Sequence, residues 1–213
     1  MKLALIGATG YVGSAILAEA LARGHHVTAI VRHPEKLATH ANLTGLAADV
    51  YDPAQVAQAV AGHDAVISAF NPGWGDADIY AKHVKGSQAI TAGVKQAGVR
   101  RLLVVGGAGS LFIAPGVQLV DTPEFPEQWK QGALGAREAL NLIKQDTDLD
   151  WSFVSPAVML EPGERRGHYR LGEDEVLMGD NGPAGISTAD LAMAIIDEIE
   201  QPKHIRRRFT AAY

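Results

Sequence analysis

The chain has 213 residues, 47% of them hydrophobic, which is enough to bury the core of one α/β domain but cramped for two. Its 24 acidic residues outnumber its 19 basic ones, and the net charge of -5 argues against binding to nucleic acid or anionic membranes. The lack of cysteine excludes a disulfide framework and a thiolate nucleophile. No leader-like or membrane-spanning apolar run is present, so we expect a cytoplasmic protein.

Short β-rich runs alternate with longer helical segments, a pattern typical of a parallel sheet covered by helices on both faces. The expected strands are 2–6, 26–31, 45–48, 65–69, 101–105, 151–154 and 208–211. The expected helices are 11–23, 52–62, 78–97, 127–144 and a last one that begins at Ser187. The pattern predicts one three-layer α/β/α domain over residues 1–213, with a doubly wound parallel sheet.

Two segments interrupt this alternation, residues 71–76 and residues 157–185, both rich in glycine and proline. Loops that follow the carboxyl ends of parallel strands form ligand crevices, so both segments are candidate pocket walls. We expect 157–185 to be a small C-terminal lid on the substrate side. Ordinary surface irregularity is the alternative.

The first strand runs directly into glycines spaced G-x-x-G-x-x-G at Gly7, Gly10 and Gly13, and a helix follows. In a Rossmann domain the first glycine permits the sharp turn, the second lets backbone amides approach a pyrophosphate, and the third allows close packing of helix and strand. The predicted strand-turn-helix context makes this triad far more specific than the bare spacing. The residues expected to contact the dinucleotide here are Gly7, Thr9, Gly10, Tyr11, Val12 and Gly13.

The end of the second strand indicates which dinucleotide is bound. NAD is usually held there by a carboxylate, but the position holds Arg32, whose guanidinium can pair with the 2′-phosphate of NADP; Lys36 can add charge. We therefore expect NADP(H), while nearby Glu35 leaves NAD(H) possible. Asp49, after the third strand, can accept from the adenine amino group or merely cap its own turn.

Four segments, 7–13, 31–37, 104–110 and 155–156, resemble the atypical short-chain dehydrogenase/reductase group, and within it the NmrA-like NAD(P)H-binding proteins. That group includes NADH-flavin reductases and biliverdin-reductase-B-like enzymes. The resemblance runs almost from end to end and implies the strand order 3-2-1-4-5-6, with substrate above the nicotinamide. It also implies that the cofactor is lined by Ser68, Ala69 and Phe70 after the fourth strand and by Pro156 after the sixth.

The sequence departs from that group in its proton donor. Alcohol dehydrogenases and epimerases of this kind usually need a Tyr-x-x-x-Lys pair, in which the lysine lowers the tyrosine pKa. No tyrosine here is followed by lysine four residues later, and the expected region holds Trp129-Lys130 instead. A sugar epimerase, a dehydratase or a steroid-type dehydrogenase is therefore disfavoured.

Hydride transfer to a planar conjugated acceptor such as flavin or quinone needs fewer catalytic groups from the protein, because the acceptor is itself electrophilic. On this hypothesis Ser110 is the catalytic hydrogen-bond donor, although it can equally cap its own loop. The expected pocket walls, which can also be ordinary core or rim residues, are Trp74, Phe112, Trp129 and Met159.

The second hypothesis is a non-catalytic protein that senses NADP(H) and regulates a partner. The scattered histidines predict no metal site, and the sequence leaves monomer and homodimer open. Arg206, Arg207 and Arg208 are expected on an exposed, charge-protected sheet edge or at an anion site.

Overall fold

Eight strands form the main sheet of the computed structural model, which describes residues 1–213. Their order is β10-β14-β8-β5-β4-β1-β2-β3, and only β10 runs antiparallel to its neighbour. The strands are β1 (Lys2–Ile6), β2 (His26–Ile30), β3 (Leu43–Leu46), β4 (Ala65–Ser68), β5 (Arg101–Val105), β8 (Asp150–Pro156), β10 (Arg170–Gly172) and β14 (Arg207–Ala212). The order β3-β2-β1-β4-β5-β8 confirms the predicted doubly wound Rossmann sheet.

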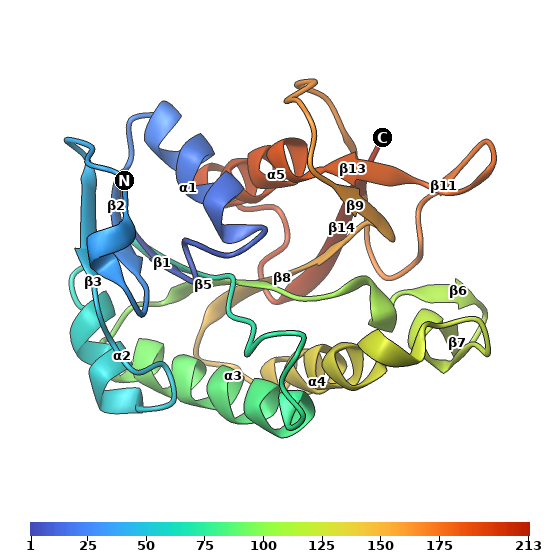
Figure 1. The fold of residues 1–213 in the computed structure, drawn as a ribbon, viewed down its shortest axis with the longest axis horizontal. Coiled ribbons are helices and arrows are strands. Elements are labelled where there is room, and N and C mark those ends of the chain that lie inside the picture. The colour runs from blue at the N-terminus through green and yellow to red at the C-terminus, as the bar shows by residue number, and fades with distance from the viewer.

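Helices cover both faces of this sheet. Figure 1 shows α1 (Gly13–Ala22) and α5 (Thr188–Glu200) on one face, with α2 (Pro53–Val60), α3 (Ile79–Gln96) and α4 (Glu127–Ile143) on the other. Two helix starts follow from local capping: the Asp52 carboxylate accepts from the Ala54 amide at 2.9 Å, and the Ser187 hydroxyl accepts from the Asp190 amide at 3.0 Å. The sheet therefore lies between two helical layers.

Each face of the sheet has its own apolar core. On β8, Phe153 belongs to the core shared with α2, α3 and α4, whereas Val154 belongs to the core shared with α1 and α5. On β14, Phe209 and Ala211 also join the α1/α5 core. Because successive strand residues point to opposite faces, Arg208 and Thr210 point to the α4 face.

The element boundaries lie within two residues of the expected ones, and two of the shifts have a clear cause. The third strand lies two residues earlier than expected, because β2 pairs with β3 from Val27 opposite Leu43 to Ile30 opposite Leu46. The first helix begins at Gly13 rather than Tyr11, because the preceding residues form a turn closed by the Gly10 amide on the Gly7 carbonyl at 2.9 Å.

Short strands fill the two irregular parts of the chain. After β5 comes a 3-10 turn, η2 (Ala108–Ser110), and then the hairpin of β6 (Phe112–Ala114) and β7 (Val117–Gln118). The segment predicted as a lid, 157–185, contains β9 (Met159–Glu161), β10, β11 (Met178–Gly179) and β12 (Gly182–Pro183), and β13 (Gly185–Ser187) begins at its end. None of the helices combines the length and apolar content that crossing a bilayer requires.

Candidate functional site

The Gly-rich turn packs so tightly that two of its glycines have no room for a side chain. Gly7 has a φ of +79°, and a Cβ there would lie 2.6 Å from the Ala69 carbonyl oxygen. A Cβ on Gly13 would lie 2.0 Å from the Gly7 carbonyl oxygen, far inside van der Waals contact. The three glycines thus let the ends of β1 and β4 and the start of α1 converge, as the glycine spacing predicts.

This turn leaves its backbone donors free. The amides of Thr9, Tyr11 and Val12 donate to no acceptor in the protein, and α1 starts immediately afterwards. Free amides at the amino end of a helix, together with the helix dipole, favour a bound anion. The residues present therefore fit a dinucleotide pyrophosphate, and Tyr11, 56% exposed, stands beside this position with its hydroxyl donating to the Leu160 carbonyl at 3.3 Å.

At the end of β2, the basic side chain of Arg32 has no partner, whereas the acidic side chain of Glu35 is already paired. Arg32 is exposed and forms no ion pair or hydrogen bond through its side chain. The Glu35 carboxylate instead pairs with the His33 ring at 3.1 Å, and both side chains are well exposed. Lys36 ends a short 3-10 turn beside them. The charges at the end of β2 therefore suit the binding of a phosphate better than the binding of ribose hydroxyls.

After β3, one oxygen of the Asp49 carboxylate accepts from the Tyr51 amide at 2.9 Å. This is the turn-capping role that the sequence left open, and the second oxygen has no partner. Tyr51 lies beyond it, where burial raises the pKa of its phenol and Lys85 stands over the ring at 5.7 Å. Asp49 thus remains a candidate for the adenine amino group through one oxygen.

The predicted cofactor residues after β4 and β8 occupy different environments. Ser68 and Pro156 are buried at the last positions of their strands, and Ala69 lies against Gly7. The Phe70 ring packs against α3, where a Cβ on Gly86 would meet it at 2.4 Å. The structure thus brings Ser68, Ala69 and Phe70 to the turn but directs the Phe70 ring toward the core.

The four expected pocket walls come from three separate places. Trp74, 57% exposed, lies against Gly132 of α4, one helical turn from Trp129, which is 49% exposed. Phe112 lies in the β6–β7 hairpin, and Met159 lies on β9 beside Gly185. Neither of two cavities, of about 290 and 250 Å³, is lined by any of these four residues. Of the four, only the two tryptophans share an element, since Trp129 lies on α4 and Trp74 packs against it.

Ser110, the proposed donor, is 2% exposed and belongs to η2. Its hydroxyl and its carbonyl both accept from the Arg208 guanidinium, at 3.0 and 2.9 Å. The expectation of an exposed basic edge is wrong for Arg208, because its side chain crosses the α4 face of the sheet and is 1% exposed. Three consecutive arginines do not by themselves indicate that one is buried. Arg208 points inward because successive side chains of a strand point to opposite faces.

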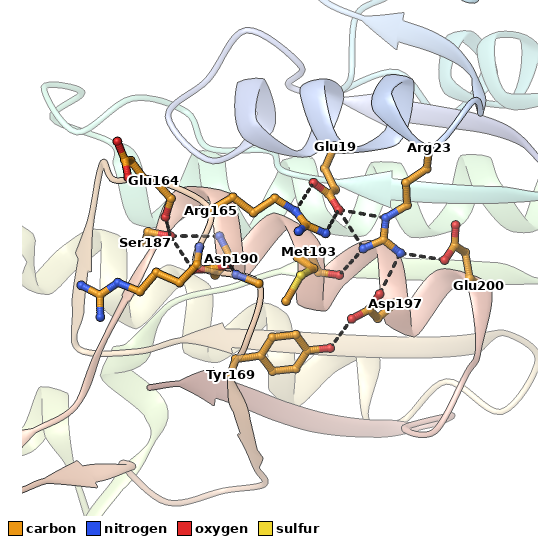
Figure 2. Close-up of polar contacts among 12 residues, drawn as sticks. Glu19, Arg23, Glu164, Arg165, Tyr169, Ser187, Asp190, Met193, Asp197 and Glu200 are labelled. Carbon is orange, nitrogen blue, oxygen red and sulfur yellow. Dashed lines mark hydrogen bonds and ion pairs between the residues drawn. The ribbon is translucent and has the colours of Figure 1, made fainter.

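A second polar network fastens part of the segment predicted as a lid, residues 162–169, to the α1/α5 layer; we call these residues the strap (Figure 2). Arg165 forms two bonds to Glu19 of α1, at 3.0 and 3.1 Å. The fully buried Asp190 carboxylate accepts from the Arg166 and Gly167 amides at 2.9 Å each, and from the Tyr213 hydroxyl at 2.6 Å. Burial raises the Asp190 pKa, but these donors outweigh it and hold the pKa below its usual value.

The topology and the Gly-rich turn define a Rossmann-type dinucleotide-binding protein. No group of three or more His, Asp and Glu side chains is placed to hold a metal ion. The sequence matches the NAD(P)H-binding protein family over residues 7–202. The chain therefore belongs to this family, in agreement with the resemblance that the motifs indicate.

Solved structures of three similar proteins cover 100% of this chain. A protein of Burkholderia pseudomallei is 47% identical, with 100% of its own chain covered and a TM-score of 0.90. A Bacteroides thetaiotaomicron protein is 49% identical, with 96% covered and a TM-score of 0.94, and one from Streptococcus pneumoniae is 38% identical, with 99% covered and a TM-score of 0.86. Their names are provisional: an exported protein, an epimerase and an NADH-flavin reductase, respectively.

Proposed function

We propose that this protein is an NADPH-dependent reductase that transfers hydride to a planar conjugated acceptor such as a flavin or a quinone. The observation that carries the proposal is the Gly-rich turn, whose free amides at Thr9, Tyr11 and Val12 suit a pyrophosphate. Membership of the NAD(P)H-binding family and the name of the S. pneumoniae relative support it.

The preference for NADPH rests on Arg32. Its guanidinium is exposed and has no partner, so it can form a bidentate pair with a 2′-phosphate without first breaking another interaction. Glu35, the nearest carboxylate along the chain, is paired with His33, which leaves the ribose hydroxyls without an obvious acceptor here.

The acceptor class follows from the missing phenol. A bound nicotinamide supplies a hydride, and the protein's own part is to position the acceptor, exclude water and stabilise the negative charge that the acceptor gains. The chain has no Tyr-x-x-x-Lys pair, so a substrate that needs strong proton transfer from the protein is disfavoured, despite the epimerase name of one relative. A flavin or quinone takes its proton from water after the hydride has arrived.

The direct test mixes the purified protein with NADPH and, separately, FMN, riboflavin, a quinone or biliverdin, and follows absorbance of the reduced nicotinamide. We expect acceptor-dependent oxidation of NADPH with at least one of these. Calorimetry that detects no binding of any nicotinamide dinucleotide would contradict the whole proposal.

Cofactor preference is tested with Arg32→Asp. We expect the NADPH dissociation constant to rise about 10- to 100-fold, because hydrogen bonds to charged groups contribute about 1.5–3 kcal/mol. The NADH dissociation constant should change much less. Arg207→Asp makes the same charge change at another exposed arginine, at the amino end of β14, and should alter neither constant. Equal weakening of both dinucleotides by Arg32→Asp would remove Arg32 from this role.

A second candidate function is an NADP(H)-sensing regulatory protein without turnover. The missing Tyr-x-x-x-Lys pair favours it, and under this function Ser110 would be a structural residue of η2. Tight NADPH binding without oxidation by any acceptor would support the sensor.

We further propose that the protein acts in the cytoplasm, in keeping with the absence of cysteine. A relative named as an exported protein makes this worth testing by cell fractionation. Recovery of the protein outside the cytoplasmic fraction would contradict it.

A further inference from the structure

Two buried Arg–Ser pairs lie in different parts of the sheet. Near the amino ends, the Arg101 guanidinium donates to the Ser152 hydroxyl at 2.8 Å. Beyond the carboxyl end of β5, the Arg208 guanidinium donates to the Ser110 hydroxyl at 3.0 Å. All four residues are 9% exposed or less, so burial does not distinguish the two pairs.

The two serines differ in where their hydroxyl hydrogens go. The Ser152 hydroxyl has two acceptors in reach, the Glu198 carboxylate at 3.0 Å and the His204 carbonyl at 2.8 Å. The Ser110 hydroxyl has no acceptor in the protein. A guanidinium has only donors, so its bond fixes the Ser110 oxygen as acceptor and leaves the hydrogen to be donated elsewhere.

The other side of the Arg208 guanidinium is bound to Asp174. Its Nε donates to the Asp174 carboxylate at 2.8 Å, and the remaining terminal nitrogen approaches the same carboxylate at 2.6 Å. The Asp174 carbonyl also accepts from the Phe112 amide at 2.9 Å. The pair is therefore joined to a residue that the sequence predicts as a pocket wall.

Two further hydroxyls without hydrogen-bond partners lie on β8 and β14, closer to the carboxyl ends than Ser152 and Arg208. Ser155 of β8 and Thr210 of β14 are opposite each other in register, 0% and 1% exposed, and neither hydroxyl has a hydrogen-bond partner. Strand alternation puts both on the α4 face with Arg208. Buried polar groups are nearly always hydrogen-bonded, so two unpaired hydroxyls at adjacent positions in the sheet are unusual.

We propose that Arg208 is a positioning residue that orients the Ser110 hydroxyl as a donor to the acceptor substrate. The inference rests on the reductase proposed above and narrows its substrate class to acceptors with a carbonyl oxygen or ring nitrogen. As hydride adds to the acceptor, negative charge develops on that atom, and the Ser110 hydrogen bond stabilises it. A proton from water then completes the reduction. The nearby guanidinium strengthens the donor, and burial keeps water from weakening it.

The test compares Ser110→Ala, Ser110→Thr and Arg208→Lys with the wild type. Loss of one preorganised donor typically lowers kcat about 100-fold, and we expect this for Ser110→Ala with FMN or a quinone. The NADPH dissociation constant, measured by calorimetry, should stay the same, and the FMN dissociation constant, measured by tryptophan fluorescence, should change far less than kcat. Ser110→Thr, which keeps the hydroxyl, should recover much of the rate.

The double variant Ser110→Ala/Arg208→Lys tests whether Arg208 affects the rate only through Ser110 or also independently of it. If Arg208 acts through Ser110, the double variant should be no slower than Ser110→Ala alone. Ser152→Ala is the matched control, because it removes the serine of the other buried pair. We expect it to lower the melting temperature and leave kcat unchanged.

Two results overturn the inference, and they differ in what else they affect. If the wild type oxidises NADPH with an acceptor and Ser110→Ala keeps the full rate, Ser110 and Arg208 are structural, while the reductase proposal stands. If the wild type binds NADPH and reduces no acceptor, the reductase proposal fails and this one fails with it. The serine variants decide the question even if Arg208→Lys does not fold.

Discussion

Polar groups serve different purposes at the two ends of the main sheet. At the amino ends, the buried Glu198 carboxylate accepts from Arg101, Ser152, His204 and the amides of Lys203 and His204. At the carboxyl ends, the amides of the Gly-rich turn and the Ser110 hydrogen are left without protein acceptors. The contrast indicates that the paired groups at the amino ends serve stability, whereas the free donors at the carboxyl ends are available to a ligand.

The largest effect on stability is expected when the hydrogen-bonded group at the amino ends of the sheet loses the Glu198 carboxylate. Glu198→Ala leaves the Arg101 guanidinium buried without a charged partner, which typically costs about 3–5 kcal/mol of folding free energy. Chemical denaturation should show this loss, while calorimetry on the folded variant should show unchanged NADPH affinity. A loss below about 1 kcal/mol would mean that this network contributes little, as an exposed pair does.

The same carboxylate predicts how stability depends on pH. Burial raises the Glu198 pKa, but hydrogen bonds from His204, Lys203 and Ser152 outweigh it and hold the folded-state pKa below the ordinary value. A carboxyl with a depressed folded pKa contributes stability above its unfolded pKa, and this stability is lost as the pH falls through the folded pKa. Wild type should thus lose stability between about pH 4.5 and lower pH more steeply than Glu198→Gln does, as measured by denaturation at each pH. Parallel curves would contradict this.

Gly13→Ala should have the largest effect at the carboxyl end. The added Cβ would lie 2.0 Å from the Gly7 carbonyl oxygen, so the turn must open at a cost of about 1–3 kcal/mol. Displaced amides should weaken NADPH at least about tenfold in calorimetry, the loss of about one hydrogen bond to a charged group. Gly75→Ala is the control, since its Cβ meets nothing within 4 Å and both stability and NADPH binding should be retained.

The smallest effect is expected at the strap. Arg165 is 49% exposed, and without it Glu19 still pairs with Arg23 at 2.8 Å. Arg165→Ala should therefore cost no more than about 1 kcal/mol. Asp190→Ala should cost more stability than Arg165→Ala, because it removes the acceptor of two strap amides. If both substitutions cost the same in denaturation experiments, the strap is not held mainly by Asp190.

Much of the fold could be predicted because its signals are local. Five helices and the seven parallel strands of the main sheet follow from hydrophobic periodicity, from Asp52 and Ser187 as caps, and from the glycines of the first turn. The third strand is displaced by two residues, since its boundaries depend on pairing with β2 rather than on its own residues. For the site, the structure brings the turn, Ala69 and Arg32 to the carboxyl edge. Of the four expected pocket walls, only Trp74 and Trp129 share an element, because both lie on or against α4.

By itself, the sequence determined the order of strands and helices, the turn that suits a pyrophosphate, and the absence of a Tyr-x-x-x-Lys pair. Backbone preferences and spacing are set by neighbouring residues, so they can be inferred from one chain. Only the tertiary structure decided that Arg208 turns inward to Ser110, 98 residues away, and that Ser155 and Thr210 lie at adjacent positions on neighbouring strands. Those partners depend on the register of β14 against β8 and on the packing of η2 over them, which no local pattern encodes.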